Sequence, residues 1–129
     1  MDVRKLDSQK TYTLDIEETR EKNRALLANI LYIECEGYLT TVHLVNESKI
    51  CTTQRLKRYE IMLEPYGFIR IHHKIIINGM YITKIKTISA TQCSVTLMQK
   101  LEFPVSKRKK KRLKSFFFND HLLVKFDHL

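Results

Sequence analysis

The stretch FIRIHHKIIIN, residues 68–78, decides how the rest of the chain can be interpreted. It contains two apolar runs, 68–71 and 75–77, of the kind that form buried strands. A polar segment of His72, His73 and Lys74 separates them, and Asn78-Gly79 after them predicts a turn. Neighbouring side chains on an extended strand point to opposite faces. We therefore expect one histidine to be buried and the other to project outward.

Short strands are predicted on both sides of this stretch. Apolar and β-branched patterns indicate them at 11–16, 30–33, 38–45, 49–51, 80–89, 94–98 and 101–105. The last two are expected to form a hairpin across Gln99 and Lys100. The chain is therefore predicted to be mostly β, with seven to ten short strands.

One helix is clearly predicted, over residues 54–63. Thr52 or Thr53 is its expected N-cap, and Pro65 prevents it from extending much further. Residues 17–29 are ambiguous, because their composition favours a helix although a β-hairpin also fits.

The chain is strongly basic, with 23 Lys and Arg against 14 Asp and Glu and a net charge of +9. Such an excess suggests a polyanionic partner, either nucleic acid or an anionic membrane surface. Seven of the eight residues in 107–114 are cationic, and their mutual repulsion predicts that this run is exposed and available to phosphates. A solvated helix face, a nuclear localisation signal or a membrane-surface patch would give the same pattern.

Other functional classes find little support in the sequence. Without a nucleophile motif, a Gly-rich phosphate loop or a carboxylate pair, we expect no enzyme, no cofactor and no small-molecule substrate. The cysteines Cys35, Cys51 and Cys93 are interpreted as reduced apolar fillers, and no zinc-ligand spacing is present. Neither a secretory signal nor an apolar run of about 20 residues is visible, so we expect a cytoplasmic protein with no membrane partner.

No helix-turn-helix can be identified, because the one clear helix is followed by Pro65 and a strand. A DNA-binding interpretation therefore requires a scaffold that contacts the grooves through loops or strands.

Five blocks of this sequence resemble the LytTR domain of bacterial transcription regulators. They are residues 30–34, Tyr38 with the strand after it, residues 53–63, residues 68–78 and residues 103–108. The fourth is the most specific, with F-x-R-x-H followed five residues later by I-N. The resemblance covers roughly 11–117, which leaves a flexible N-terminal segment at 1–10 and an apolar C-terminal extension at 118–129. It indicates a stand-alone domain without a receiver domain.

The resemblance implies short antiparallel strands in about three sheets, with one central helix and a C-terminal helix, and it favours a hairpin over 17–29. It also implies that loops enter successive major grooves of double-stranded DNA. By position, the expected base contacts are Tyr38, His73 and Lys107, and the expected phosphate contacts are Arg55, Arg70, Lys74, Arg108 and Lys111. His72 is the expected structural histidine of its pair. For Tyr38, simple packing at a strand start is the alternative.

Three positions depart from the pattern of the family. Lys74 stands where serine is common, which should add phosphate affinity. Lys107 stands where arginine is usual and lacks the bidentate fork that favours guanine. Gln99-Lys100 replaces the expected Asp-Gly or Asn-Gly, which predicts a wider turn.

The leading hypothesis is a sequence-specific, DNA-binding transcription regulator, bound as two copies, a homodimer, on repeated half-sites. The first alternative is a module that pairs with another regulator, motivated by the apolar tail at 116–126. The second is a non-specific nucleic-acid binder, including an RNA binder. All nucleic-acid hypotheses predict salt-dependent affinity, but only the leading hypothesis, sequence-specific DNA binding, predicts discrimination between sequences.

Overall fold

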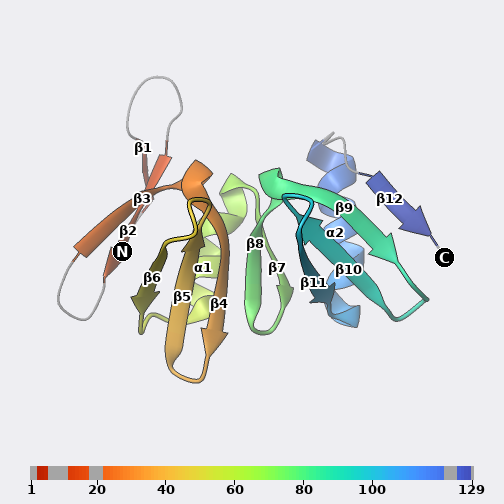
Figure 1. Cartoon of the computed structure of the whole chain (residues 1–129), viewed down its shortest axis with the longest axis horizontal. Coiled ribbons are helices and arrows are strands. Elements are labelled where there is room, and N and C mark those ends of the chain that lie inside the picture. The colour runs from red at the N-terminus through yellow and green to blue at the C-terminus, as the bar shows by residue number, and fades with distance from the viewer. Residues whose placement is uncertain (1–2, 6–11, 18–21, 121–124, 129) are drawn as a thin grey trace.

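The computed structural model describes residues 3–5, 12–17, 22–120 and 125–128, which form twelve strands in three sheets with two α-helices (Figure 1). The central sheet is antiparallel and has the order β6-β5-β4-β8-β7. Its strands are β4 (Ile30–Glu36), β5 (Leu39–Leu44), β6 (Lys49–Thr52), β7 (Phe68–His72) and β8 (Ile75–Asn78). The predicted mostly-β class and the three sheets are confirmed.

In the described part of the ambiguous segment 17–29, a strand pairs antiparallel with the strand before it, and no α-helix is present. A three-stranded sheet is formed by β1 (Val3–Lys5), β2 (Tyr12–Glu17) and β3 (Lys22–Leu26), and the short 3-10 helix η1 (Leu27–Asn29) follows. Within this segment, Ala25 and Leu27 are buried at alternate positions in the same core as Leu14 and Ile16 of β2, so tertiary burial overrides its helical propensity. Strand β1 was not predicted from the sequence.

The third sheet has the order β11-β10-β9-β12. Its strands are β9 (Ile82–Thr87), β10 (Cys93–Leu97), β11 (Leu101–Val105) and β12 (Lys125–His128), and only the β9–β12 pairing is parallel. The expected wider turn is present between β10 and β11, where three residues separate the paired Leu97 and Leu101. Within this turn, Met98 and Gln99 both have positive φ. The side chains of residues 114–129 lie outside the described residues, so protein interaction through the apolar tail stays a prediction.

The predicted helix is shorter than expected. Helix α1 spans Leu56–Leu63, its N-cap is Arg55, and no side chain caps it, so the prediction of Thr52 or Thr53 was wrong. The reason is that two threonine hydroxyls form hydrogen bonds with the backbone of Gln54, which precedes the helix. Thr52 Oγ1 accepts from the Gln54 N–H, and Thr40 Oγ1 donates to its carbonyl.

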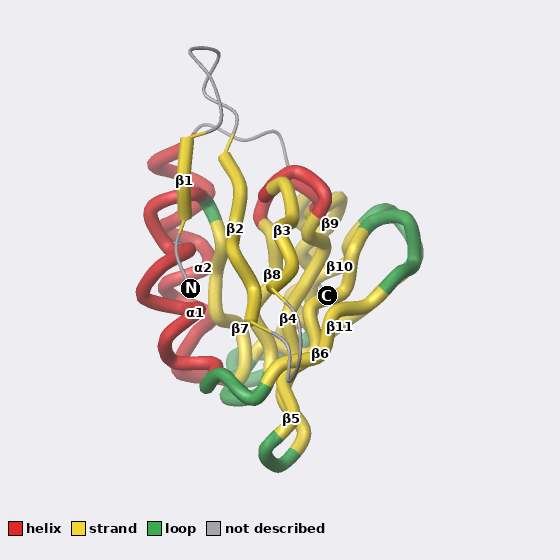
Figure 2. Tube along the Cα trace, turned by 90° about the vertical axis from the view of Figure 1, so that its left-hand side faces the viewer, coloured by secondary structure: helices red, strands yellow, loops and turns green. Residues whose placement is uncertain are grey.

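Helix α2 spans Lys107–Asp120 and contains the basic run. Both helices lie on the same side of the sheets (Figure 2). Two 3-10 helices, η2 (Glu64–Tyr66) and η3 (Gly79–Tyr81), complete the described elements.

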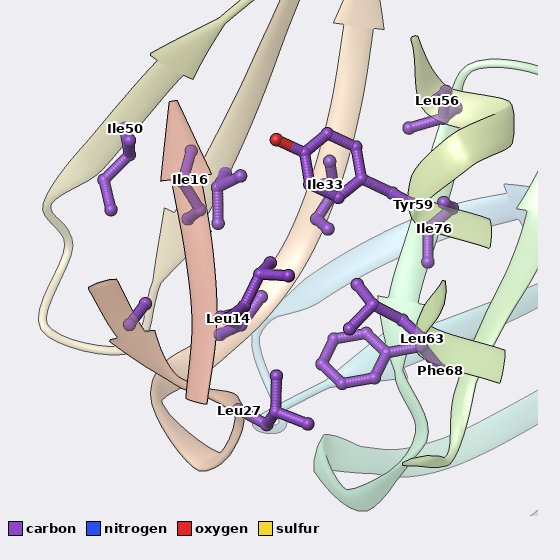
Figure 3. Close-up of a cluster of buried hydrophobic side chains, with 13 residues drawn as sticks. Leu14, Ile16, Leu27, Ile33, Ile50, Leu56, Tyr59, Leu63, Phe68 and Ile76 are labelled. Atoms are coloured by element: carbon purple, nitrogen blue, oxygen red, sulfur yellow. The ribbon is translucent and has the colours of Figure 1, made fainter. Parts of the chain in front are cut away.

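The central sheet separates two hydrophobic cores because its side chains alternate between two faces. On β8, Ile76 belongs to the first core, with α1 and the three-stranded sheet (Figure 3). Its neighbour Ile77 belongs to the second core, with the third sheet and Leu113 of α2. The apolar run at 75–77 is continuous because both faces of its strand are buried.

Asn78 closes the upper end of the β7–β8 hairpin. Its side chain is buried, donates to the carbonyls of Leu27 and Ile30, and accepts from the N–H of Met80. The turn predicted at Asn78-Gly79 is therefore the start of η3, where the chain passes from the central to the third sheet.

Candidate nucleic-acid interface

Three segments that are distant in sequence meet at one edge of the protein, at the bottom of Figure 1: the β4–β5 turn (37–38), the β7–β8 turn (73–74) and the start of α2 (107–108). Backbone hydrogen bonds join them. The N–H of Cys35 donates to the carbonyl of Lys74 at 2.9 Å, and the N–H of Ser106 donates to the carbonyl of Ile71 at 2.9 Å. We call these three segments the lower edge. They carry the three predicted base contacts, Tyr38, His73 and Lys107.

Tyr38 lies at the tip of the β4–β5 hairpin. Gly37, before it, has a φ of 59°, and Glu36 pairs with Leu39, so residues 37 and 38 form a tight two-residue turn that favours glycine first. The Tyr38 side chain is 96% exposed. The packing alternative for this tyrosine is therefore wrong, because an aromatic ring so exposed has little packing to provide.

His73 and Lys74 form the β7–β8 turn, since His72 pairs with Ile75. Both are exposed, whereas His72 is half-buried and its Nδ1 accepts from the N–H of Lys74 at 3.3 Å. The prediction of one buried and one outward histidine was too simple, because His73 leaves the strand. The two imidazole rings lie 4.2 Å apart. Burial, His73 and Lys74 together lower the pKa of His72.

The start of α2 presents cations on one side. The carbonyl of Ser106 accepts from the N–H groups of Lys109 and Lys110. The side chains of Lys107, Arg108 and Lys111 are exposed, and none makes an ion pair within the described part of the chain.

The other cations of the basic run have partners inside the protein. Lys109 lies 3.8 Å and Arg112 3.6 Å from Glu60 Oε2, and Lys110 donates to the carbonyls of Ser89 and Ala90. The prediction that the whole run is exposed and available to phosphates is therefore wrong for Lys109 and Lys110, which are half-buried, and Arg112 is exposed but paired. A single helix must turn some of eight consecutive residues toward the protein.

Arg70 points inward from β7. Its side chain is only 17% exposed, and its guanidinium donates to Glu60 at 3.1 Å and to the carbonyls of His72 at 3.4 Å and His73 at 2.6 Å. These hydrogen bonds fix the β7–β8 turn from its protein-facing side, and they leave few guanidinium N–H groups of Arg70 free to bind a phosphate.

Arg55 flanks an open groove of about 670 Å³ between the Tyr38 turn and the beginning of α1. Its side chain is exposed, and Lys57 and Arg70 also line the groove. The lower edge and the groove beside it therefore carry several cations, and the exposed Glu36, next to the Tyr38 turn, lies 4.0 Å from Lys74.

Glu60 was not among the site residues predicted from the sequence. It lies on the buried face of α1, with Leu56, Tyr59 and Leu63, and contacts Lys57, Arg70, Lys109 and Arg112. Helical spacing alone places residue 60 on the same face as 56 and 63, so a carboxylate there had to find cations. The sequence did not indicate which cations these are.

Other kinds of site find no support in the described ranges. They contain no group of three or more His, Cys, Asp or Glu side chains that could hold a metal ion. None of their helices is long and apolar enough to cross a membrane.

The chain is similar in sequence and fold to known proteins. Residues 23–117 match the family model described as the LytTr DNA-binding domain. Over 58 residues the chain is 43% identical to the transcriptional regulatory protein LytR of several Staphylococcus aureus strains, a match covering 45% of this chain and 23% of that protein. A solved LytTr DNA-binding domain from Bacillus cereus superposes with a TM-score of 0.70 at 19% identity, covering 81% of this chain and 95% of that one, and shows a shared fold.

Proposed function

Because the chain belongs to the LytTR family of DNA-binding domains, we propose that it regulates transcription by binding specific sequences through the lower edge. One observation carries the proposal: three exposed, cationic or aromatic segments from different parts of the chain are held side by side by backbone hydrogen bonds. Since the chromosome of a bacterium lies in its cytoplasm, the protein acts there.

We assign base contacts to Tyr38, His73 and Lys107. A lysine ammonium can donate to guanine O6 or N7, a histidine N–H to the same acceptors, and a tyrosine hydroxyl to a base edge or a phosphate. The three side chains project from turns or a helix start, so each can enter a major groove without moving the sheets behind it.

Phosphate contacts fall to Arg55, Lys74, Arg108 and Lys111, which are exposed around these three residues. Such contacts fix the register on the duplex without selecting a sequence. Arg70 receives a different role from the one the sequence suggested: its guanidinium is used within the protein, so it supports the His73 turn from behind.

Selection of bound sequences from a random duplex pool, followed by affinity measurements over a salt series, tests the proposal. A repeated motif spaced by about one helical turn would support two copies bound on one face of the DNA. Four phosphate contacts predict a slope of log K against log salt of about −4 per protomer. The variant K107A should cost about 1–3 kcal/mol at one base pair and little at the others. A salt slope without any enriched motif would leave only a non-specific binder.

A further inference from the structure

Glu60 is a nearly buried carboxylate that joins three elements. Its side chain is 8% exposed, and its two oxygens face different partners. Oε1 lies 3.1 Å from Arg70 of β7 and 3.4 Å from Lys57 of its own helix, whereas Oε2 faces Lys109 and Arg112 of α2. We call these five residues the Glu60 cluster.

The carboxylate is ionised at neutral pH. Burial by itself would raise the pKa of Glu60, but the hydrogen bond from Arg70 and the charges of Lys109, Lys57 and Arg70 outweigh it, so the pKa is lowered. A buried charge of this kind is tolerated only when cations compensate it, so the cluster is a constraint on where its cations lie.

The cluster is connected to two of the segments that carry the proposed base contacts. Through Arg70, the carboxylate is connected to the carbonyls of His72 and His73 in the β7–β8 turn. Through Lys109 and Arg112, it anchors the first turns of α2, which begins at Lys107. Arg112 also bonds to Glu64, which fixes this arm at a second point.

We propose that Glu60 is a positioning residue for sequence recognition, which holds the His73 turn and the start of α2 in one arrangement and withholds Lys109 and Arg112 from phosphate. This inference rests on the proposed DNA-binding function. The proposal assigns two different roles to the cations of the basic run. Lys107, Arg108 and Lys111 contact DNA, and Lys109 and Arg112 hold the helix in place.

Three variants test this division. E60Q keeps the shape of the side chain but removes its charge. K109Q/R112Q removes the α2 arm and leaves the Arg70–Glu60 pair intact. K111Q is the matched control, because it neutralises a cation of the same helix that makes no ion pair within the described residues. For each, affinity is measured across a salt series for the selected duplex and for a scrambled one.

We expect E60Q to lower the ratio of selected to scrambled affinity by roughly tenfold, while its salt slope steepens by about 1–2 because two cations are released. K109Q/R112Q should lower the same ratio with little change in slope. K111Q should weaken both duplexes equally and reduce the slope by about 0.9.

The inference is overturned if K109Q/R112Q behaves like K111Q, because Lys109 and Arg112 would then be phosphate contacts. It is also overturned if E60Q folds and retains the wild-type ratio. Should E60Q fail to fold, because the half-buried Arg70 would lose its charged partner, K109Q/R112Q decides alone. A wild-type protein without sequence discrimination would instead contradict the proposed function itself.

Discussion

The two ends of the β7–β8 hairpin differ in their exposure to solvent, although both belong to the same eleven consecutive residues, 68–78. At the upper end, Asn78 is 3% exposed and bonds to backbone of three other residues. At the lower end, His73 and Lys74 are exposed and form a turn. One motif therefore specifies the fold at one end and presents the proposed binding surface at the other.

The largest effect is expected at the upper end. Asn78→Ala would leave the buried carbonyls of Leu27 and Ile30 without this donor, so we expect the free energy of unfolding to fall by about 2–4 kcal/mol in urea titrations. Asn46 is the matched control: it accepts from the Ser48 N–H in an exposed turn, so Asn46→Ala should cost less than about 1 kcal/mol. An equal loss of unfolding free energy in the two variants would contradict the structural role of the Asn78 side chain.

The next largest effect is expected at the lower end, where a substitution should weaken DNA binding and leave stability nearly unchanged. His73→Ala should cost about 1–3 kcal/mol of binding free energy at one base pair and change the free energy of unfolding by less than about 0.5 kcal/mol. Competition binding with single-base variants of the selected site measures the first quantity. His43→Ala provides the opposite case, since His43 stacks on Tyr32 and pairs with Glu34 on the sheet, so it should lose stability and keep base preference. If His43→Ala altered base preference as well, the effect of His73→Ala could not be attributed to a base contact.

The smallest effect is a pH dependence that originates at His72, the last residue of β7, beside the turn of the lower end. The pKa of His72 is lowered in the folded protein, so the unfolded chain takes up this proton first as the pH falls. Its stabilising contribution is therefore fully present above the unfolded pKa of about 6.5 and decreases as the pH falls below it. Urea titrations between pH 7.5 and 5.5 should show a slightly flatter profile for His72→Gln than for the wild type. A steeper profile would mean that protonation stabilises the native state.

Much of the fold could be predicted because the relevant signals are local. The apolar runs at 68–71 and 75–77 and the turn chemistry of Gly37 determine elements through neighbouring residues. The extended structure of the segment 17–29 could not be predicted from local propensity, because the burial of Ala25 and Leu27 depends on contacts with distant strands. The start of α1 was missed for the same reason, since Thr40, fourteen residues earlier, binds the carbonyl of Gln54.

The candidate site shows the same limit more sharply. Sequence and family resemblance indicated Tyr38, His73 and Lys107, and all three lie at the lower edge. The charge run, however, could not be divided from the sequence alone. Only the packing of α2 beside α1 distinguishes Lys109 and Arg112, which face Glu60, from Lys111, which does not.

The position of the lower-edge turns has a consequence for how such proteins can diverge. Tyr38 and His73 occupy two-residue turns, and Lys107 begins a helix, so none of them contributes to either hydrophobic core. Under the proposed assignment, substitutions at these three positions would change the preferred DNA sequence one position at a time while the fold stays intact. A duplicated gene would then acquire a new target site without passing through an unstable intermediate, as long as Asn78 and Glu60 are kept.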